Sequence, residues 1–289
     1  MTKKISPLMA LAAMLLLTAC YHDQHEETPG EYGDQPVGYL TPLLTWDDEA
    51  DGGTTIDDLH FIVSGTTGGT GLTHDFNSSA SAAEWLQQLS VGDYDLLVTA
   101  DMDEAHGYIL ENAGTRGVTR ADEELHTALP DTRVSLSDPS SSPAQAWYAV
   151  THATVREDEI TVAEFRLQRL LSEISVIVRN VPTGAAITAS VERVAHDVLL
   201  TQRDGQGRYG VADRDDYLTV SLGALAADPA DAATLRHDDH TLMPTAGGQE
   251  RCYLTLSVTT PEGTRLTYLA DAPNRRTRIF PWLTSTDHA

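Results

Sequence analysis

Residues 92–99 read Gly-Asp-Tyr-Asp-Leu-Leu-Val-Thr, a run of aliphatic, aromatic and β-branched residues that starts at a glycine. Such residues fit the pleated, half-buried surface of a sheet, and glycine is typical of the turn that leads into a strand. We therefore predict a β-strand from Tyr94 to Thr99, entered by a turn at Gly92. The rest of the chain repeats this pattern and has few long segments of helical period.

Further short runs of the same kind are separated by clusters of Gly, Asp, Asn and Pro, which is typical of β-sandwiches. The predicted strands are Tyr39–Trp46, Leu59–Ser64, Trp147–Val155, Thr161–Leu170, Ile174–Val181, Ile187–Leu200, Tyr217–Leu222, Arg251–Thr260 and Arg265–Ala270. The 270 residues that follow residue 19 are more than one small core normally organises. We predict an all-β fold with two tandem domains, residues 37–158 and residues 159–289.

Three segments between the predicted strands have local signals of their own. Ser81 and Glu84 have the spacing of a capping box ahead of Trp85, which favours a short helix, but the same segment could be a strand that leads into the next one. Residues 102–132 are polar and contain several glycines, which predicts a long exposed loop. Thr260-Pro261-Glu262-Gly263 supplies turn chemistry between the last two strands, so we expect a hairpin.

The N-terminus carries the features of a bacterial lipoprotein signal. Lys3 and Lys4 precede an apolar segment, Leu8–Leu17, which is shorter than the ~20 residues that span a bilayer. The segment ends in Leu17-Thr18-Ala19-Cys20, the pattern at which lipoproteins are lipidated and cut. We predict that residues 1–19 are a signal peptide and that Cys20 is the lipidation site. The alternative is an ordinary signal peptide followed by an incidental cysteine.

Lipidation would tether the mature chain to a membrane. In such lipoproteins the cysteine thiol takes a diacylglyceryl group and the new N-terminus a further acyl chain, such as palmitate. One chain binds only marginally, at about 0.8 kcal/mol per buried methylene, so a multiply acylated Cys20 anchors stably. Residues 20–36 are polar, acidic and nearly free of aliphatic side chains, which predicts a solvated tether. His22 and His25 would bind a metal there only by ordering the tether, and we predict no metal site.

The chain is strongly acidic. The formal net charge is −24, and it becomes −26 when Lys3 and Lys4 leave with a signal peptide that has no acidic residue. Such a surface disfavours nucleic acid and anionic membranes as partners, and we interpret the acidity as a source of solubility rather than as an acidic active site. Cys20 and Cys252 are the two cysteines of the sequence, so no disulfide forms within a chain whose Cys20 carries lipid.

No residue pattern predicts catalysis, a cofactor or a metal. Two histidines of His237-Asp238-Asp239-His240 could share a metal on a short helix, but a solvated loop is the favoured interpretation and a third ligand is missing. The nucleophile motif G-x-S-x-G does not occur, and residues 66–71 lack the lysine of a phosphate-binding loop. Cys252 lies in an alternating strand and is interpreted as a buried hydrophobe. The tryptophans, interpreted as core or domain-interface residues, are Trp46, Trp85, Trp147 and Trp282. We predict that the chain is not an enzyme.

Several short motifs, in order along nearly the whole mature chain, carry a resemblance to a known family. They are Leu17-Thr18-Ala19-Cys20, Leu44-Thr45-Trp46-Asp47, Leu89-x-x-Gly92-x-Tyr94-x-Leu96, Arg169-Leu170-Leu171-Ser172-Glu173-Ile174-Ser175-Val176 and Leu242-Met243-Pro244. In this combination the chain resembles the fimbrial anchor lipoprotein family of Bacteroidia, whose members sit at the base of major and minor fimbriae. The resemblance implies two transthyretin-like β-sandwich domains and a role in anchoring or initiating a fimbria.

The resemblance also implies partners and a location. Neighbouring fimbrial subunits would join by β-strand complementation, in which an extended segment adds to an open sheet edge. Asp23, Glu26 and Glu27, shortly after Cys20, resemble the signal that sends lipoproteins of Bacteroidia to the outer face of the outer membrane. We therefore expect a lipid-anchored, surface-exposed protein, and the sequence does not indicate which strands border the acceptor groove.

Other functions stay open at this point. Related shaft subunits are matured by an arginine-specific protease, and Arg116 and Arg120 lie in a predicted exposed loop, although simple solvation explains two loop arginines equally. The chain could therefore be a fimbrial shaft or tip adhesin subunit. From another class, it could be a surface lipoprotein that captures a glycan or a host protein with one sandwich face. An envelope hydrolase has no supporting residues.

Overall fold

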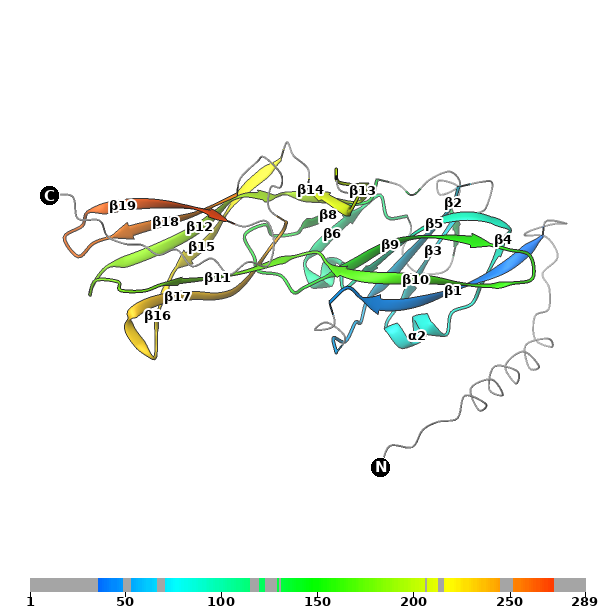
Figure 1. Cartoon of the computed structure of the whole chain (residues 1–289), viewed down its shortest axis with the longest axis horizontal. Coiled ribbons are helices and arrows are strands. Elements are labelled where there is room, and N and C mark those ends of the chain that lie inside the picture. Colours follow the sequence, from blue (N-terminus) through cyan, green and yellow to red (C-terminus); the bar gives the residue numbers. More distant parts are fainter. Residues whose placement is uncertain are drawn as a thin grey trace, which may run out of the picture. The chain divides into compact units, whose positions relative to one another are not determined.

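The computed structural model describes residues 36–48, 53–66, 71–114, 120–122, 129, 131–205, 207–212, 216–244 and 252–272. Nearly every element in these ranges is a strand, which confirms the predicted all-β fold (Figure 1). Two short elements are helical instead: the α-helix α2 (Ser79–Ala83) and the 3-10 helix η3 (Glu104–His106). None of the described helices is long and apolar enough to cross a membrane.

The largest sheet has eight strands in the order β4-β1-β10-β9-β5-β2-β3-β7. The bounds are β1 Val37–Trp46, β2 Leu59–Gly65, β3 Gly71–Phe76, β4 Gln87–Ser90, β5 Gly92–Ala100, β7 Arg120–Asp122, β9 Trp147–Val155 and β10 Ile160–Arg169. β10 changes partner along its length, because residues 160–167 pair in parallel with β1 whereas Gln168 and Arg169 pair with β9. This change lets β4, β1 and β10 form a second layer over the other five strands (Figure 1).

These two layers share one apolar core. Tyr94, Leu96 and Val98 alternate along β5, are 0% exposed, and belong to the same cluster as Phe61 of β2 and Phe165 of β10. The rings of Phe61 and Phe165 meet edge to face, with centroids 5.3 Å apart. The strand predicted at residues 94–99 is therefore confirmed as part of β5, and alternate side chains of β5 fill the sandwich.

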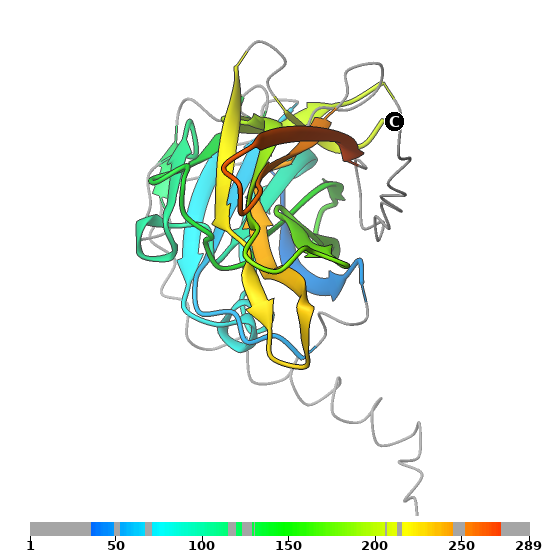
Figure 2. The same ribbon diagram turned by 90° about the vertical axis from the view of Figure 1, so that its left-hand side faces the viewer.

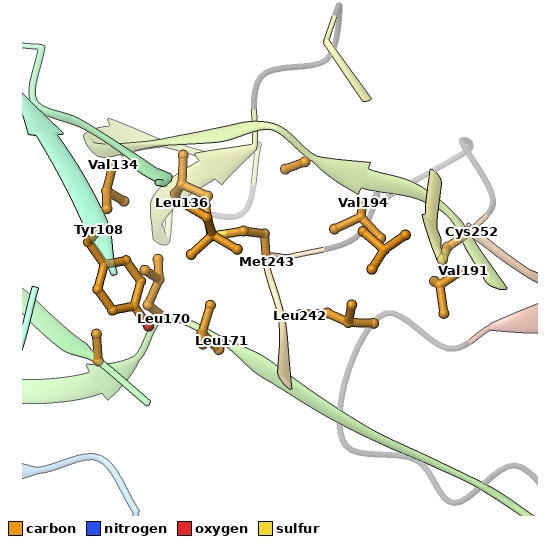
Figure 3. Close-up of a cluster of buried hydrophobic side chains, with 14 of the residues drawn as sticks. Tyr108, Val134, Leu136, Leu170, Leu171, Val191, Val194, Leu242, Met243 and Cys252 are labelled. Atoms are coloured by element: carbon orange, nitrogen blue, oxygen red, sulfur yellow. The ribbon is translucent and has the colours of Figure 1, made fainter. Parts of the chain in front are cut away.

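The opposite face of this sheet is buried as well. Leu97 of β5 and Ile62 of β2 belong to a second apolar cluster, which includes Tyr108 (Figure 3). A four-stranded sheet in the order β14-β13-β8-β6 contributes to that cluster. Its strands are β6 Tyr108–Glu111, β8 Arg133–Leu136, β13 Asp197–Arg203 and β14 Tyr209–Ala212. Because β2 is covered on both faces, all seven of its residues are buried.

The prediction of a long exposed loop at residues 102–132 is wrong for the described part of that segment. Met102 is 0% exposed and Tyr108 is 1% exposed, and the Tyr108 hydroxyl donates to the carbonyl of Ala144. The polar residues between them have structural roles: Asp103 Oδ1 accepts the backbone N–H of His106 at 3.0 Å and caps η3. A segment whose composition is typical of a loop therefore contains short elements of secondary structure with buried side chains.

The segment with two interpretations contains both a helix and a strand. α2 is capped by Ser78, whose Oγ accepts the backbone N–H of Ser81 at 3.1 Å, and Glu84 is the residue that ends the helix. β4 follows and pairs with β1. The capping box predicted from Ser81 and Glu84 is therefore wrong, because the helix begins three residues earlier.

Beyond Arg169 the chain forms two further sheets, one in the order β15-β12-β18-β19 and one in the order β11-β17-β16. The bounds are β11 Ser172–Val178, β12 Ala186–Ala195, β15 Tyr217–Ala224, β16 Ala226–Asp228, β17 Asp231–Leu242, β18 Cys252–Thr259 and β19 Arg265–Ala272. Val176 of β11 and Leu254 of β18 belong to one cluster, so the two sheets pack face to face. Figure 2 shows β19 in brown and the β16–β17 hairpin in gold in separate layers.

Three predictions for these sheets have clear outcomes. The predicted hairpin is confirmed as β18 and β19, with Gly263 in its turn at φ 87°, a backbone region that favours glycine. The single strand predicted at residues 187–200 is two strands, β12 and β13, which lie in different sheets. The helix or solvated loop predicted around residues 237–240 is wrong, because that segment lies in β17, which pairs with β11 and β16.

The division into domains at residues 158 and 159 stays a prediction. β10 follows that boundary, yet it pairs with β1 and β9. β13 also follows it and pairs with β8. The second apolar cluster contains side chains from both sides of the boundary, among them Tyr108, Leu171 and Val191 (Figure 3). Strands from both predicted domains therefore share sheets and a core.

Candidate functional site

An apolar strip on the last described strand is the starting point of the candidate site. The register of the hairpin places Leu266 of β19 beside Val258 of β18, and Tyr268 beside Leu256. Directly paired residues of neighbouring strands point to the same face of a sheet. Leu256 lies in the core between the two C-terminal sheets, so Leu266 and Tyr268 also point to that inner face.

The inner face of β19 is nevertheless open. Leu256 is 3% exposed, whereas Tyr268 is 38% and Leu266 is 42% exposed. Ala189 of β12, which pairs with Leu256, is buried like its neighbour. Among the described residues the sheet that contains β19 has four strands and the facing sheet has three, so one strand has no strand opposite it there. For that reason the inward side chains of β19 are more exposed than those of β18.

The chain connection between the sheets shows which edge of the facing sheet lies near β19. Leu225 alone separates β15 from β16, is buried, and donates its N–H to the carbonyl of Ile187 at 2.9 Å. The edge strands β15 and β16 therefore lie on one side of the two sheets. The opposite edges of the two sheets are β11 and β19. We call the region between β11 and β19, with Leu266 and Tyr268 on its wall, the open margin.

Both strands that border the open margin have one pairing partner in the part of the chain that the structure describes. β11 pairs with β17, and β19 pairs with β18. Val176 and Val178 of β11 are buried in the core, so the margin continues an apolar interior. An edge strand next to uncovered apolar side chains is the arrangement that accepts an added strand, because backbone groups supply hydrogen bonds and the apolar wall receives alternate side chains.

The two histidines of the segment His237-Asp238-Asp239-His240 lie side by side on β17. His237 Nε2 and His240 Nδ1 are 3.4 Å apart, because a bulge at Asp238 and Asp239 brings both rings to one side of β17. Burial, followed by the charge of His237, lowers the pKa of His240, which disfavours a charged pair of rings. The group of potential metal ligands found among the described residues does not include either histidine.

That group consists of Asp57, Asp101 and His106, whose ligand atoms all lie within 4.8 Å of one another. His106 Nδ1 lies 2.6 Å from Asp103 Oδ1, and His106 Nε2 lies 3.1 Å from Asp57 Oδ1. Asp101 Oδ1 accepts the backbone N–H groups of Asp57 and Asp58 at 3.0 and 3.1 Å, and burial raises the pKa of Asp101. These hydrogen bonds explain the group as a structural tie between η3 and the segment before β2, and we assign no metal to it.

The histidine of this tie gives a first prediction. Burial alone lowers the pKa of His106, but Asp103, Asp101 and Asp57 together outweigh it and raise the value above the usual 6.5. Protonated His106 therefore stabilises the fold below about pH 6.5, and this contribution is lost as the pH rises through the folded pKa. NMR titration of the imidazoles should give His106 a pKa above 6.5 and the half-buried His74 a pKa below it. Equal values for the two rings contradict the prediction.

The other residues singled out from sequence take structural places or lie outside the described ranges. Cys252 is 1% exposed and its Sγ lies 3.0 Å from the carbonyl oxygen of Glu192, which confirms a buried residue of β18. Trp46 and Trp147 pack edge to face in the N-terminal core, with centroids 5.6 Å apart. Trp85 is half-buried and also packs against that core. The residues outside the described ranges are Cys20, His22, His25, Arg116 and Trp282.

Comparison with sequence models of protein families identifies the family of this chain. The sequence model of the family described as fimbrillin-A associated anchor proteins Mfa1 and Mfa2 matches residues 66–275, more than half of the chain. The chain belongs to this family. The Mfa1 and Mfa2 anchor family consists of fimbrial structural proteins and is not an enzyme family, which confirms the resemblance and the prediction that the chain is not an enzyme. No curated protein matches the chain significantly.

Several solved structures align with this member of the anchor family, and the first of them shares its fold. A provisionally described adhesin from Bacteroides ovatus aligns with a TM-score of 0.53 at 12% identity, over 85% of this chain and 90% of that chain. The fimbrial anchor protein Mfa2 from Porphyromonas gingivalis aligns with a TM-score of 0.45 at 15% identity, over 81% and 80% of the two chains. The tip fimbrial protein Mfa3 from the same organism, with a C-terminal truncation, aligns with a TM-score of 0.40 at 12% identity, over 84% of each chain.

Sequence reasoning predicted the hairpin that carries Leu266 and Tyr268 but did not identify the open margin. The alternation of Leu266, Tyr268 and Ala270 is the same as in a strand whose inner face is covered. The number of strands in the facing sheet makes the difference, and that number is set by pairings such as Val178 with Leu235. No local motif reports it.

Proposed function

We propose that this chain is an outer-membrane surface lipoprotein that anchors or initiates a fimbria, and that it binds a neighbouring subunit by strand complementation at the open margin. The observation that carries the proposal is the exposed inner face of β19 next to the edge of β11. Membership of the fimbrial anchor family supports the same role. A shaft or tip adhesin subunit remains the alternative within the family.

The margin has the dimensions and chemistry of a strand-acceptor site. β11 spans seven residues and β19 spans eight, so an incoming segment of similar length could pair along either one. Leu266 and Tyr268 are two residues apart on one strand and would contact alternate side chains of that segment. Such pairing combines main-chain hydrogen bonds with apolar burial, which gives a long-lived joint between subunits.

The membrane end of the proposed anchor is the acylated Cys20. Residues 20–36 are acidic and, when fully extended, reach about 60 Å. β1 begins at Val37, directly after this tether. We propose that the lipid holds the chain in the outer membrane while the tether sets the sheets away from the surface, and that the sheets form two tandem transthyretin-like domains.

The alternative of a glycan-binding or host-protein-binding lipoprotein has little support, because few aromatic side chains are exposed among the described residues. A sugar platform needs flat rings on one exposed face, and the described tryptophans pack against the N-terminal core instead. Tyr268 is an exposed aromatic residue, but it lies on an inner sheet face beside an open edge. That setting fits a strand better than a flat sugar ring.

Deletion of the gene tests the proposed function. Cells without the chain are expected to shed fimbriae into the medium or to carry fimbriae of altered length, because the base of the polymer is lost. The wild-type gene should restore attachment, Tyr268→Asp should fail to do so, and Leu269→Asp should succeed, since Leu269 is 66% exposed on the other face of β19. Electron microscopy and a count of shed fimbriae measure both effects. Attachment and length that do not change on deletion contradict the anchor role.

A further inference from the structure

Two histidine rings of β17 face each other at a spacing that suits two ligands of one metal ion. His237 Nε2 and His240 Nδ1 lie 3.4 Å apart, and the two ring centroids are 5.4 Å apart. Hydrogen bonds from N–H donors usually measure about 2.9–3.0 Å between the heavy atoms, so a bond between these rings is long and weak. Two imidazole nitrogens that each bind a tetrahedral Zn²⁺ at about 2.0–2.1 Å lie about 3.3–3.4 Å from each other.

A bulge in β17 brings the two rings together. Side chains three residues apart on a regular strand point to opposite faces, because the side-chain period of a strand is two. Between His237 and His240 the pairing advances three residues on β17 but only two on β11. Asp239 lies in this bulge with φ 53°, and its N–H donates to Ser175 Oγ at 3.1 Å. The extra residue turns both rings to the same side of the strand.

The two rings are reachable from solution. His237 and His240 are half-buried. In the described part of the chain, β16 pairs with β17 at Arg236 and at residues before it, so the histidines follow directly after the end of that pairing. Water can therefore fill the coordination positions of a metal ion that the two rings leave open.

The charged neighbours of the pair are engaged elsewhere. Asp238 Oδ2 lies 2.5 Å from Arg236 Nε, and Ser175 Oγ donates to Asp239 Oδ1 at 3.2 Å. Among the described residues, the hydrogen-bonding contact of the two rings is the one between them, and His240 Nε2 is buried without a partner. The pair therefore differs from His106, whose two ring nitrogens both contact carboxylates.

The ligand type and the charge of the chain select a class of ion. Imidazole nitrogens suit Zn²⁺, Cu²⁺ and Ni²⁺, whereas Ca²⁺ and Mg²⁺ take oxygen ligands. The formal net charge of −24 attracts cations in general. A transition-metal dication meets both conditions.

We propose that His237 Nε2 and His240 Nδ1 bind one transition-metal dication of the Zn²⁺ type, with water in its remaining coordination positions. The ligands lie on β17 and not on the open margin, so this inference does not depend on the proposed function. The bound ion fixes the bulge and stabilises the folded chain, because the two ligands are brought together only when β17 pairs with β11.

Zinc titration of the mature chain tests the proposal. In every protein compared, His22 and His25 are replaced by alanine, so that the tether supplies no imidazole. Calorimetry should show one Zn²⁺ bound per chain, and NMR should show the imidazole signals of His237 and His240 shifting together. His237→Gln should weaken binding at least tenfold, because loss of a partner that only orients a ligand already costs about 10–100-fold. The matched control is His152→Gln, on the 54% exposed His152 of β9, which should leave the affinity unchanged.

A stability measurement gives a second readout. Zn²⁺ should raise the unfolding temperature of the parent chain and of His152→Gln, but not that of His237→Gln or His240→Gln. Circular dichroism without metal checks that each variant folds. Three outcomes overturn the proposal: imidazole signals of the pair that do not move with Zn²⁺, equal zinc affinity of His237→Gln and His152→Gln, or Mg²⁺ that binds the pair as tightly as Zn²⁺. With the first outcome, the contact is a long hydrogen bond between two rings.

Discussion

Cys20→Ala protein is expected to leave the outer-membrane fraction entirely, and fimbriae should be lost from the cell with it. The thiol of Cys20 is the proposed attachment point of the diacylglyceryl group, and without it the acyl chains and the processing at Ala19 are both lost. Each buried methylene contributes about 0.8 kcal/mol to membrane binding, so removing the chains removes the anchor. Fractionation and detergent phase partitioning measure the effect.

The second cysteine provides a matched control. Cys252 is buried in β18, with its Sγ beside the carbonyl oxygen of Glu192, so Cys252→Ala should leave lipidation and location unchanged. The sheets of the Cys20→Ala variant should still fold, because the substitution lies upstream of an acidic tether that precedes the first strand. Cys20→Ala protein that still partitions into detergent and stays on the surface shows that another feature holds it there, and the lipid-anchor proposal is then wrong.

The strands that the sequence predicted correctly are those with strong local patterns. Tyr94 to Val98 alternate beside a glycine turn, and Cys252–Thr259 and Arg265–Ala272 flank a turn that contains Pro261 and Gly263. Each pattern depends on residues within a window of about ten, which is the range over which alternation and turn chemistry act. For that reason the all-β class followed from the sequence.

The strands that the sequence missed depend on distant partners. β17 contains Arg236, His237, Asp238 and Asp239, a polar composition typical of a loop, and it is a strand there because β11, which lies far earlier in the chain, pairs with it. β6 was missed for a similar reason, since it pairs with β8 more than twenty residues later. Backbone hydrogen bonds with a distant strand outweigh local preference in both cases.

Local sequence patterns could not predict the position of the candidate site, for a further reason. The open margin arises from a difference in strand number between two facing sheets, and that difference depends on where the chain crosses from β15 to β16. Leu225, the residue at the crossing, has no distinctive neighbours in sequence. The resemblance to fimbrial anchors predicted that an acceptor groove exists, and only the pairing of distant strands gives it a proposed position.

Phe61→Ala is expected to destabilise the chain by about 3–5 kcal/mol, a large part of the 5–15 kcal/mol that separates folded from unfolded domains. Phe61 is 1% exposed and its ring meets those of Phe76, Trp85 and Phe165 at centroid distances of 5.4, 5.7 and 5.3 Å. Phe61 lies on β2 and Phe165 on β10, so the substitution opens a cavity between the two layers of the N-terminal sandwich. Urea unfolding of the mature chain, followed by tryptophan fluorescence, measures the loss.

Leu269→Ala supplies the comparison, because Leu269 is a large apolar side chain that is 66% exposed. Its removal creates no cavity, and surface substitutions of this kind usually change stability by less than about 0.5 kcal/mol. Phe61→Leu should fall between the two, since a leucine refills part of the cavity but loses the edge-to-face contacts with Phe76 and Phe165. If Phe61→Ala and Leu269→Ala cost the same, β2 and β10 do not share the core described above.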